Sequence, residues 1–161
     1  MFCLLFTGLI FLIGCQNSGT QAKTENTPVT TAVSKPKEIP LLIDFNTIKG
    51  KTLAQVERKL GKAKNVEKVK GYPCENTDCK RAYFKNGDYE IIFKRNKVDR
   101  VTINHVPDLT HNDNALESLG LKPMPPTFKN PDNVIRWQPV GDINEISFFI
   151  DYILIQVTNP E

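Results

Sequence analysis

Four side chains near the middle of the chain have the types and spacing of metal ligands. Cys74 and Cys79 form a C-x₄-C pair in GYPCENTDCKR, and His105 and His111 form an H-x₅-H pair. Together they make a Cys₂His₂ set, which structural zinc sites use. However, 25 residues separate the two pairs, and the sequence between them predicts β-strands rather than a finger loop. The long separation between the cysteine pair and the histidine pair therefore disfavours a zinc site.

The segment HVPDLTHNDN concentrates further polar residues. His105, Asp108, His111 and Asp113 could bind a cation, or supply a general base with an orienting carboxylate. The favoured interpretation is a polar connection between two halves of the folded chain, in which Asp113 or Asn114 caps the next helix. The sequence has no nucleophile motif such as G-x-S-x-G. We therefore predict no catalytic residue, no metal and no cofactor.

Length and composition limit the kind of protein that can position these residues. The chain has 161 residues, of which 40% are hydrophobic and 24% are charged, with a net charge of +3. These values are close to the globular norm, which disfavours a disordered chain and a multi-pass membrane protein. The nine glycines never form the G-x-G-x-x-G or P-loop patterns that bind nucleotides. The length suits one domain, or two small repeats packed on each other.

The N-terminus has the pattern of a secretion signal. Residues 2–13 are almost entirely apolar, and this run is shorter than the about 20 residues that a membrane-spanning helix needs. The motif LIGC, which ends at Cys15, resembles a bacterial lipobox, in which the cysteine thiol receives lipid and the preceding peptide bond is cut. The resemblance implies a signal peptide over residues 1–14 and a mature chain beginning at lipidated Cys15. No Lys or Arg precedes Cys15, so the start of translation is expected upstream of Met1.

Export has consequences for location and for cysteine chemistry. Gln16 follows the lipidated cysteine, and by resemblance to Gram-negative sorting signals it indicates the outer membrane, with the chain facing the periplasm. Acyl chains anchor such a protein firmly in the membrane. In an oxidising compartment, Cys74 and Cys79 are expected to form a disulfide. Nucleic acid is disfavoured as a partner because the protein is exported.

Residues 15–38 have the composition of a flexible tether. Thirteen of the 23 residues from Gln16 to Glu38 are Ser, Thr, Asn, Gln or Pro, and none is aromatic. Such a segment cannot bury enough apolar surface to offset its conformational entropy. As a flexible coil, it would hold the folded part on the order of 25 Å from the membrane.

The folded part is predicted to begin near residue 39 with a helix followed by strands. Thr52 opens a T-x-x-Q capping box, Leu53 and Val56 share one helical face, and Gly61 suits a left-handed C-cap. The dipeptide Asn86-Gly87 predicts a turn between two strands. The strands expected in this half cover residues 80–85, 88–94 and 97–105.

The second half repeats this order with few identities. A capping box at Asn114 predicts a short helix, and strands are expected over residues 134–138, 143–150 and 152–158. An offset of 55 residues aligns Arg81 with Arg136 and Glu90 with Glu145. The shared order of elements indicates an internal duplication.

A family resemblance accompanies this order of elements. Residues 48–52, Val56, Leu60-Gly61 and Ala63 resemble the opening of the SmpA/OmlA, or BamE-like, lipoprotein domains. The tandem order is similar to that of the β-lactamase inhibitory proteins. The resemblance implies an α+β fold of two tandem BamE-like repeats, over residues 39–105 and, more weakly, 106–161. Each repeat would pack short helices on its own three-stranded antiparallel sheet.

Charge and apolar residues indicate a binding surface. Residues 49–100 hold 15 Lys and Arg against 7 Asp and Glu, a net of +8, whereas residues 101–161 hold 3 against 8, a net of −5. The basic half could approach anionic headgroups or an acidic partner, or the two halves differ only in their solvated faces. The run FFIDYILI cannot place all its apolar side chains on one side. The candidate interface residues are Trp137, Phe149, Tyr152, Arg95 and Lys97.

Together these features predict a non-catalytic protein, lipid-anchored in the bacterial envelope, that binds another protein. The BamE-like resemblance implies an accessory of outer-membrane or envelope assembly. The duplication favours an alternative, a periplasmic inhibitor or immunity lipoprotein that blocks a target enzyme. A third interpretation, a ligand carrier or enzyme, requires a deep polar pocket around residues 105–113.

Overall fold

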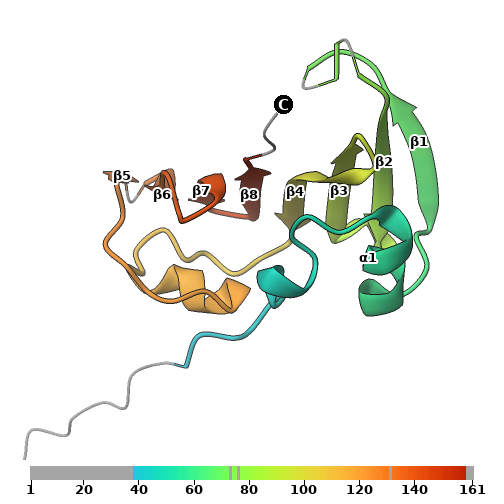
Figure 1. Cartoon of the computed structure of the whole chain (residues 1–161). Helices are drawn as coiled ribbons and strands as arrows, with labels where there is room; N and C mark the ends of the chain where they lie inside the picture. The colour runs from blue at the N-terminus through green and yellow to red at the C-terminus, as the bar shows by residue number, and fades with distance from the viewer. Residues whose placement is uncertain (1–37, 73, 76, 131, 159–161) are drawn as a thin grey trace, which may run out of the picture. The chain divides into compact units, whose positions relative to one another are not determined.

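Eight antiparallel strands form a single sheet in the order β1-β2-β3-β4-β8-β7-β6-β5 (Figure 1). This computed structural model describes residues 38–72, 74–75, 77–130 and 132–158. The predicted signal peptide over residues 1–14, the lipidation site Cys15 and the tether up to residue 37 lie outside the described residues. The strands are β1 (Asn65–Val69), β2 (Cys79–Phe84), β3 (Tyr89–Lys94), β4 (Lys97–Asn104), β5 (Phe128–Asn130), β6 (Val134–Trp137), β7 (Ile143–Phe149) and β8 (Tyr152–Val157).

Among the described residues, one α-helix and three 3₁₀ helices accompany the sheet. The α-helix α1 (Leu53–Leu60) begins with the predicted capping box, in which the side chains of Thr52 and Gln55 each accept a hydrogen bond from the other's backbone N–H. Gly61 follows with φ 90° and ψ 175°. This conformation needs glycine, but it is extended rather than the predicted left-handed helical one. The 3₁₀ helices are η1 (Phe45–Thr47), η2 (Lys85–Gly87) and η3 (Ala115–Leu119).

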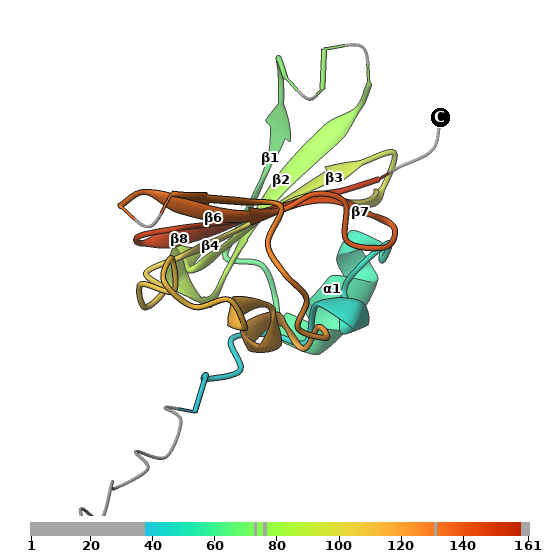
Figure 2. The same ribbon diagram turned by 90° about the vertical axis from the view of Figure 1, so that its left-hand side faces the viewer.

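Alternation along the strands gives the sheet one buried face. The helices α1, η1 and η3 lie on this side of the sheet (Figures 1 and 2), and they contribute Val56, Phe45 and Leu116 to the core. Burial of each such apolar side chain contributes about 1.5–3 kcal/mol. One buried cross-strand row consists of Phe84, Tyr89, Ile103, Ile153, Phe148 and Ile135.

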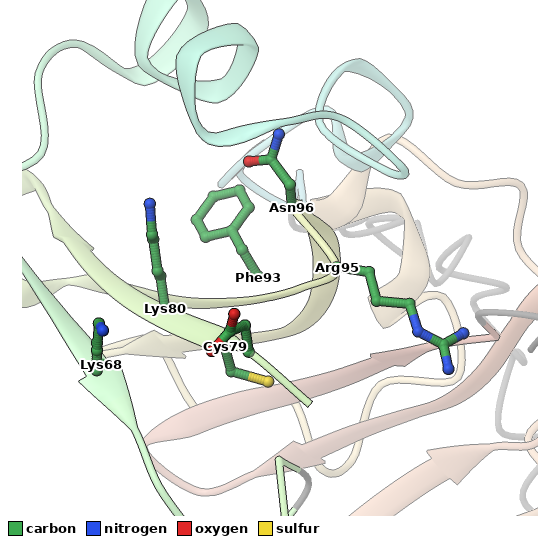
Figure 3. A pocket seen from close by; sticks show the side chains of 7 residues that line it. Lys68, Cys79, Lys80, Phe93, Arg95 and Asn96 are labelled. Carbon is green, nitrogen blue, oxygen red and sulfur yellow. The ribbon is translucent and has the colours of Figure 1, made fainter. Parts of the chain in front are cut away.

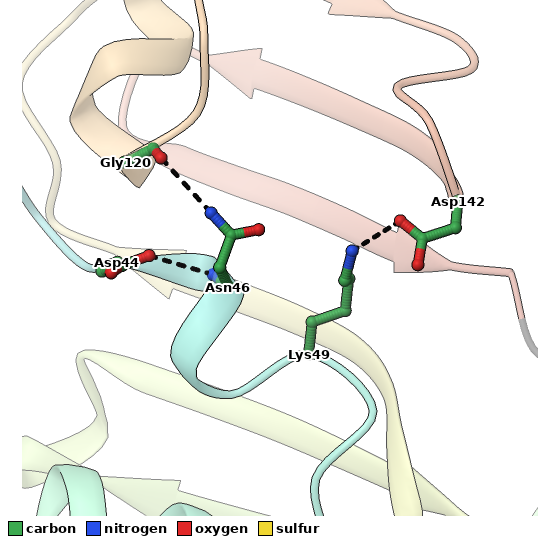
Figure 4. Close-up of polar contacts among 5 residues, drawn as sticks. All are labelled: Asp44, Asn46, Lys49, Gly120 and Asp142. Atoms are coloured by element: carbon green, nitrogen blue, oxygen red, sulfur yellow. Dashed lines mark hydrogen bonds and ion pairs between the residues drawn. The ribbon is translucent and has the colours of Figure 1, made fainter.

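The segment before α1 connects the two halves of the chain. The backbone N–H of Leu42 donates a hydrogen bond to the carbonyl of Ser118 at 2.8 Å. Farther along, the Lys49 ammonium forms an ion pair with Asp142 at 2.5 Å (Figure 4). These contacts join the N-terminal segment to η3 and to the turn before β7.

Gly120 is needed where this segment meets the end of η3. Its φ of 67° is a left-handed conformation, and a Cβ on Gly120 would lie 3.1 Å from Oδ1 of Asp44. The carbonyl of Gly120 also accepts a hydrogen bond from the Asn46 amide at 3.4 Å (Figure 4). Both the backbone conformation and the close approach therefore require glycine.

The predicted fold of two tandem repeats, each with helices on its own three-stranded sheet, is wrong. The strands β4 and β8 pair through five residue pairs, from Arg100–Gln156 to Asn104–Tyr152. All the strands therefore belong to one eight-stranded sheet. This pairing satisfies the backbone groups that two separate sheets would leave on exposed edges. Only one α-helix is present in the described part of the chain, so the second half lacks the expected counterpart of α1.

The two strands missing from the sequence prediction are the edge strands. β1 and β5, with the sequences NVEKV and FKN, are exposed along almost their whole length. They lack the apolar alternation that identifies a half-buried strand. The helix predicted after Asn114 is the short 3₁₀ helix η3, and the Asn114 side chain makes no capping hydrogen bond. The six other strands are confirmed, each end lying within one residue of the prediction.

Candidate functional site

The sheet has a continuous surface on the side opposite the helices. No helix of the described residues lies there (Figures 1 and 2). The side chains on this surface point away from the core because they alternate with the buried row. We call it the open face. One cross-strand row on it crosses all eight strands and consists of Asn65, Tyr83, Glu90, Thr102, Leu154, Ser147, Arg136 and Phe128.

Aromatic side chains are spread over the open face. The rings of Phe149 and Tyr152, on either side of the β7–β8 turn, stack with their centroids 4.4 Å apart. Tyr72 is 70% exposed, and the guanidinium of Arg100 lies 4.9 Å from the centre of its ring. Phe128, on the edge strand β5, is 52% exposed. Aromatic and arginine side chains are the ones that most often dominate the binding energy of protein interfaces.

A charged cluster orders the β1–β3 part of the open face. Arg81 Nε lies 3.0 Å from Oε1 of Glu90, and Arg81 Nη1 lies 3.5 Å from Oε1 of Glu67. The Tyr83 hydroxyl donates a hydrogen bond to Glu67 at 3.1 Å. A side-chain hydrogen bond with Tyr83 is the largest cause that raises the pKa of Arg81. The charges of Glu90 and Glu67 raise it further. Exposed ion pairs contribute only about 0.2–1 kcal/mol each, so the main effect of the cluster is to fix these side chains in position.

A similar cluster occurs on β6 and β7. Arg136 Nε donates a hydrogen bond to the Ser147 hydroxyl at 2.8 Å and lies 3.2 Å from Oε1 of Glu145. The Ser147 hydroxyl donates to Glu145 at 2.7 Å. Arg136 and Glu145 are the residues that the offset of 55 aligns with Arg81 and Glu90. Both ends of the open face therefore hold an arginine paired with a carboxylate of the following strand.

The loop between β1 and β2 stands at one end of the open face. The sulfur atoms of Cys74 and Cys79 lie 2.22 Å apart, as a disulfide. This pair packs against Ile92 of β3. Part of the loop, including Tyr72, and strand residues including Arg100 line a cleft of about 320 Å³. The disulfide therefore holds the loop against the sheet beside this cleft.

Four of the five candidate interface residues are at least partly accessible. Phe149 and Tyr152 lie on the open face and are half-buried. Arg95 and Lys97 are exposed at the β3–β4 turn. That turn lies between the strands predicted over residues 88–94 and 97–105, with φ values of 50° at Arg95 and 60° at Asn96.

Trp137 is a core residue rather than an interface residue. Its side chain is 0% exposed and lies on the helix side of β6. The indole N–H donates a hydrogen bond to the carbonyl of Met124 at 2.8 Å, and the ring makes an edge contact with Phe148 at a centroid distance of 5.6 Å. Because its apolar body is buried and its one donor is satisfied, Trp137 has no group left to offer a partner.

Several residues of the open face were not identified from the sequence. Arg81, Tyr83 and Arg100 alternate with buried residues along β2 and β4. Strand alternation could therefore have placed them together on the outer face. Tyr72 and Phe128 lie in a loop and in a polar edge strand, where no local pattern indicates their orientation.

The polar segment around residues 105–113 connects the two halves of the sheet. The His105 ring is exposed and its Nδ1 lies 3.2 Å from Oδ1 of Asp88. Asp113 instead forms an ion pair with Lys129 of β5. In the part of the chain that the structure describes, no three His, Cys, Asp or Glu residues are grouped to hold a metal ion. His105 and Asp113 therefore interact with separate neighbours.

Replacing Asp108 with Asn is expected to lower stability at neutral pH but not at acidic pH. Hydrogen bonds from the backbone N–H of Thr110 and then from its hydroxyl lower the pKa of Asp108 below the ordinary value of 3.8. A carboxyl group whose pKa is lowered by folding stabilises the protein above its unfolded pKa, and this contribution is lost as the pH falls through the folded pKa. Denaturant unfolding at about pH 7 and about pH 2 measures the difference between Asp108→Asn and the parent at each pH. An equal difference at both would show that the charge of Asp108 does not stabilise the fold.

Comparison of the chain with protein-family models, with curated proteins and with solved structures found no match. Across the described ranges, no helix combines the length and the apolar character that crossing a membrane requires.

Proposed function

We propose that this chain is a non-catalytic protein of the bacterial envelope, anchored by lipid at Cys15, that binds another protein through its open face. Its role is accessory to outer-membrane or envelope assembly, as the BamE-like resemblance implies. One observation carries the proposal. The eight-stranded sheet has one face under helices and one face of aromatic and arginine side chains held by stacking and ion pairs.

The open face has the dimensions of a protein interface. With neighbouring strands about 4.8 Å apart, eight strands span roughly 34 Å. The strands have three to eight residues, and a mean length of about five residues adds roughly 17 Å, for an area of roughly 570 Å² before side-chain relief and the overhanging loop are included. A standard interface buries about 800 Å² on each partner. A small molecule would cover only a fraction of this surface.

The charges around the open face indicate the chemistry of the partner. Lys94 and Lys97 are directly opposite each other on β3 and β4, and neither forms an ion pair with another described residue. Arg100 lies nearby under the Tyr72 ring. An acidic surface on the partner would complement this end, and the attraction would speed association most at low salt.

The β1–β2 loop favours a second candidate function, a periplasmic inhibitor or immunity lipoprotein. The Cys74–Cys79 disulfide ties this loop to the start of β2, and Tyr72, two residues before Cys74, is 70% exposed. A rigid loop with an exposed aromatic side chain can occupy an enzyme's cleft at a low entropic cost. In this case the partner would be the target enzyme rather than an assembly component.

Site-specific photo-crosslinking in cells tests the proposal. A photoreactive amino acid at Tyr152 places the probe on the open face. The same amino acid at Met124, which is 40% exposed beside the Trp137 indole, is the control on the helix side. We expect an adduct with one envelope protein from position 152 and none from position 124. No adduct from position 152, or the same adduct from both positions, would contradict binding through the open face.

The identity of the captured protein separates the two candidates. A β-barrel assembly component or another structural protein of the envelope supports the accessory role, and a hydrolase or toxin supports the inhibitor. The variant Cys15→Ser is expected to move the protein to the soluble fraction. Continued tight membrane association of this variant would contradict the lipid anchor while leaving the result at position 152 intact.

A further inference from the structure

A cavity of about 550 Å³ opens beside the β3–β4 turn, at the end of the sheet formed by β1, β2 and β3. Its lining includes Lys68, Lys80, Phe93 and Asn96. The Lys80 and Asn96 side chains lie around the Phe93 ring, whereas Arg95, also at the cavity, extends away from them (Figure 3). The pocket therefore combines two ammonium groups and one amide beside an aromatic ring.

The strand register places two like charges directly opposite each other. Lys68 of β1 is the partner of Lys80 of β2, and Lys80 in turn is opposite the buried Phe93. Directly opposed side chains in an antiparallel pair have Cβ atoms about 4.5–5.5 Å apart, and like charges at this spacing are destabilising. Neither lysine forms an ion pair with another described residue. An anion between them would relieve this repulsion.

The neighbouring charges leave the pocket positive. Asp78 is the one carboxylate among the lining residues that the structure describes. Three cationic side chains also line the cavity, those of Lys68, Lys80 and Arg95, so positive charges outnumber the negative one. The backbone carbonyl of Asp78 accepts a hydrogen bond from the Arg95 N–H at 3.4 Å, which holds the loop at this turn. The cavity is thus attractive to anions and unsuited to cations.

We propose that this pocket binds a phosphate group. A phosphate monoester carries a charge of about −1.5 to −2 at neutral pH and has three strong acceptor oxygens. The two ammonium groups of Lys68 and Lys80 match that charge, and the Asn96 amide supplies a third donor. The phosphate belongs either to a small soluble molecule or to a lipid headgroup. Lys68 and Lys80 lie on the opposite face of the sheet from Phe149 and Tyr152, so substitutions at these lysines test the pocket separately from the aromatic part of the open face.

Titration of the full-length Cys15→Ser chain with inorganic phosphate tests the pocket. Backbone amide NMR shifts are compared with those in sodium chloride of equal ionic strength. We expect saturable shifts around Lys80 and Asn96 with phosphate and none with chloride. In the double variant Lys68→Gln/Lys80→Gln, the apparent Kd should rise about 10-fold or more because two charge-assisted hydrogen bonds are lost. Equal shifts with both salts, or an unchanged Kd in the double variant, would overturn the proposal.

Two controls keep the result interpretable. Lys122→Gln removes an exposed lysine in the second half of the chain and should leave the phosphate Kd unchanged. The double variant should unfold at the same denaturant concentration as the parent, or higher, because it removes a repulsive pair. A loss of phosphate binding that also occurs in Lys122→Gln would assign the effect to net charge and overturn the site.

Vesicles distinguish the two sources of phosphate. The same chain is sedimented with neutral phosphatidylcholine vesicles, with or without phosphatidic acid, whose headgroup is a phosphate monoester. Co-sedimentation that requires both phosphatidic acid and the two lysines assigns the site to a lipid headgroup. Saturable binding of free phosphate without vesicle binding assigns it to a soluble ligand. Binding of neither probe would overturn the proposal.

Discussion

Replacing Tyr152 with alanine is expected to weaken binding of the crosslinked partner by about 10-fold or more, the effect typical of an aromatic hot-spot residue. Tyr152 is opposite Asn104 where β8 meets β4, near the middle of the strand order. Its ring is held by stacking on Phe149, so little conformational freedom remains to be lost on binding. Truncation therefore removes contact area that the free protein has already ordered.

The measurement is the Kd of the purified partner, with unfolding of the variant followed in parallel. Met124→Ala removes an exposed apolar side chain from the helix side and should leave the Kd unchanged. Equal affinities of Tyr152→Ala and the parent, at unchanged stability, would remove Tyr152 from the interface. A loss of affinity in Met124→Ala instead would place the interface on the helix side.

Replacing Trp137 with alanine is expected to lower the free energy of unfolding by about 3–5 kcal/mol, as for other large-to-small changes in a core. The side chain is 0% exposed and packs against Phe148. The change leaves a cavity and also removes the indole donor to the Met124 carbonyl. Domains of this size are stabilised by only about 5–15 kcal/mol. The substitution should therefore remove a large share of the free energy of unfolding.

Trp137→Phe separates the two contributions to this loss. Phenylalanine keeps most of the buried aromatic surface but lacks the N–H, so it should cost only about 1–3 kcal/mol. Urea unfolding followed by circular dichroism gives both values, because Trp137 is the only tryptophan and its fluorescence is lost in these variants. Partner binding by folded Trp137→Phe should match the parent. A weaker affinity of Trp137→Phe for the partner, at unchanged stability, would show that Trp137 belongs to the interface.

Trp137 and Tyr152 differ in role because they lie on opposite faces of the sheet. Both Trp137 and Tyr152 come from apolar strands of the second half, and the sequence makes both candidate interface residues. In the structure, Trp137 is in the same strand as Arg136, which is on the open face. Because successive residues of a strand point to opposite sides, the register of β6 against β7 decides that Trp137 is buried.

Local features were predictable because short-range chemistry determines them. The capping box at Thr52 and the helix that follows depend on residues within one turn. The six predicted strands are those whose apolar alternation, or a nearby turn signal, marks them individually. The Cys74–Cys79 pair is likewise separated by only 5 positions. For each of these features, the residues that matter are neighbours in the sequence.

The arrangement of these elements depends on the tertiary structure. The pairing of β4 with β8, which turns two expected sheets into one, joins Asn104 to Tyr152 across 48 positions of sequence. The polar edge strand β1 forms because β2 offers it a hydrogen-bonding edge, and its own residues carry no strand pattern. The open face and the Lys68–Lys80 pocket both depend on this register. The sequence by itself determines the local elements, and its N-terminal pattern predicts the lipid anchor that we propose. Only the long-range backbone pairing decides which side chains meet, because its cooperative hydrogen bonds and core burial arise once distant strands are aligned.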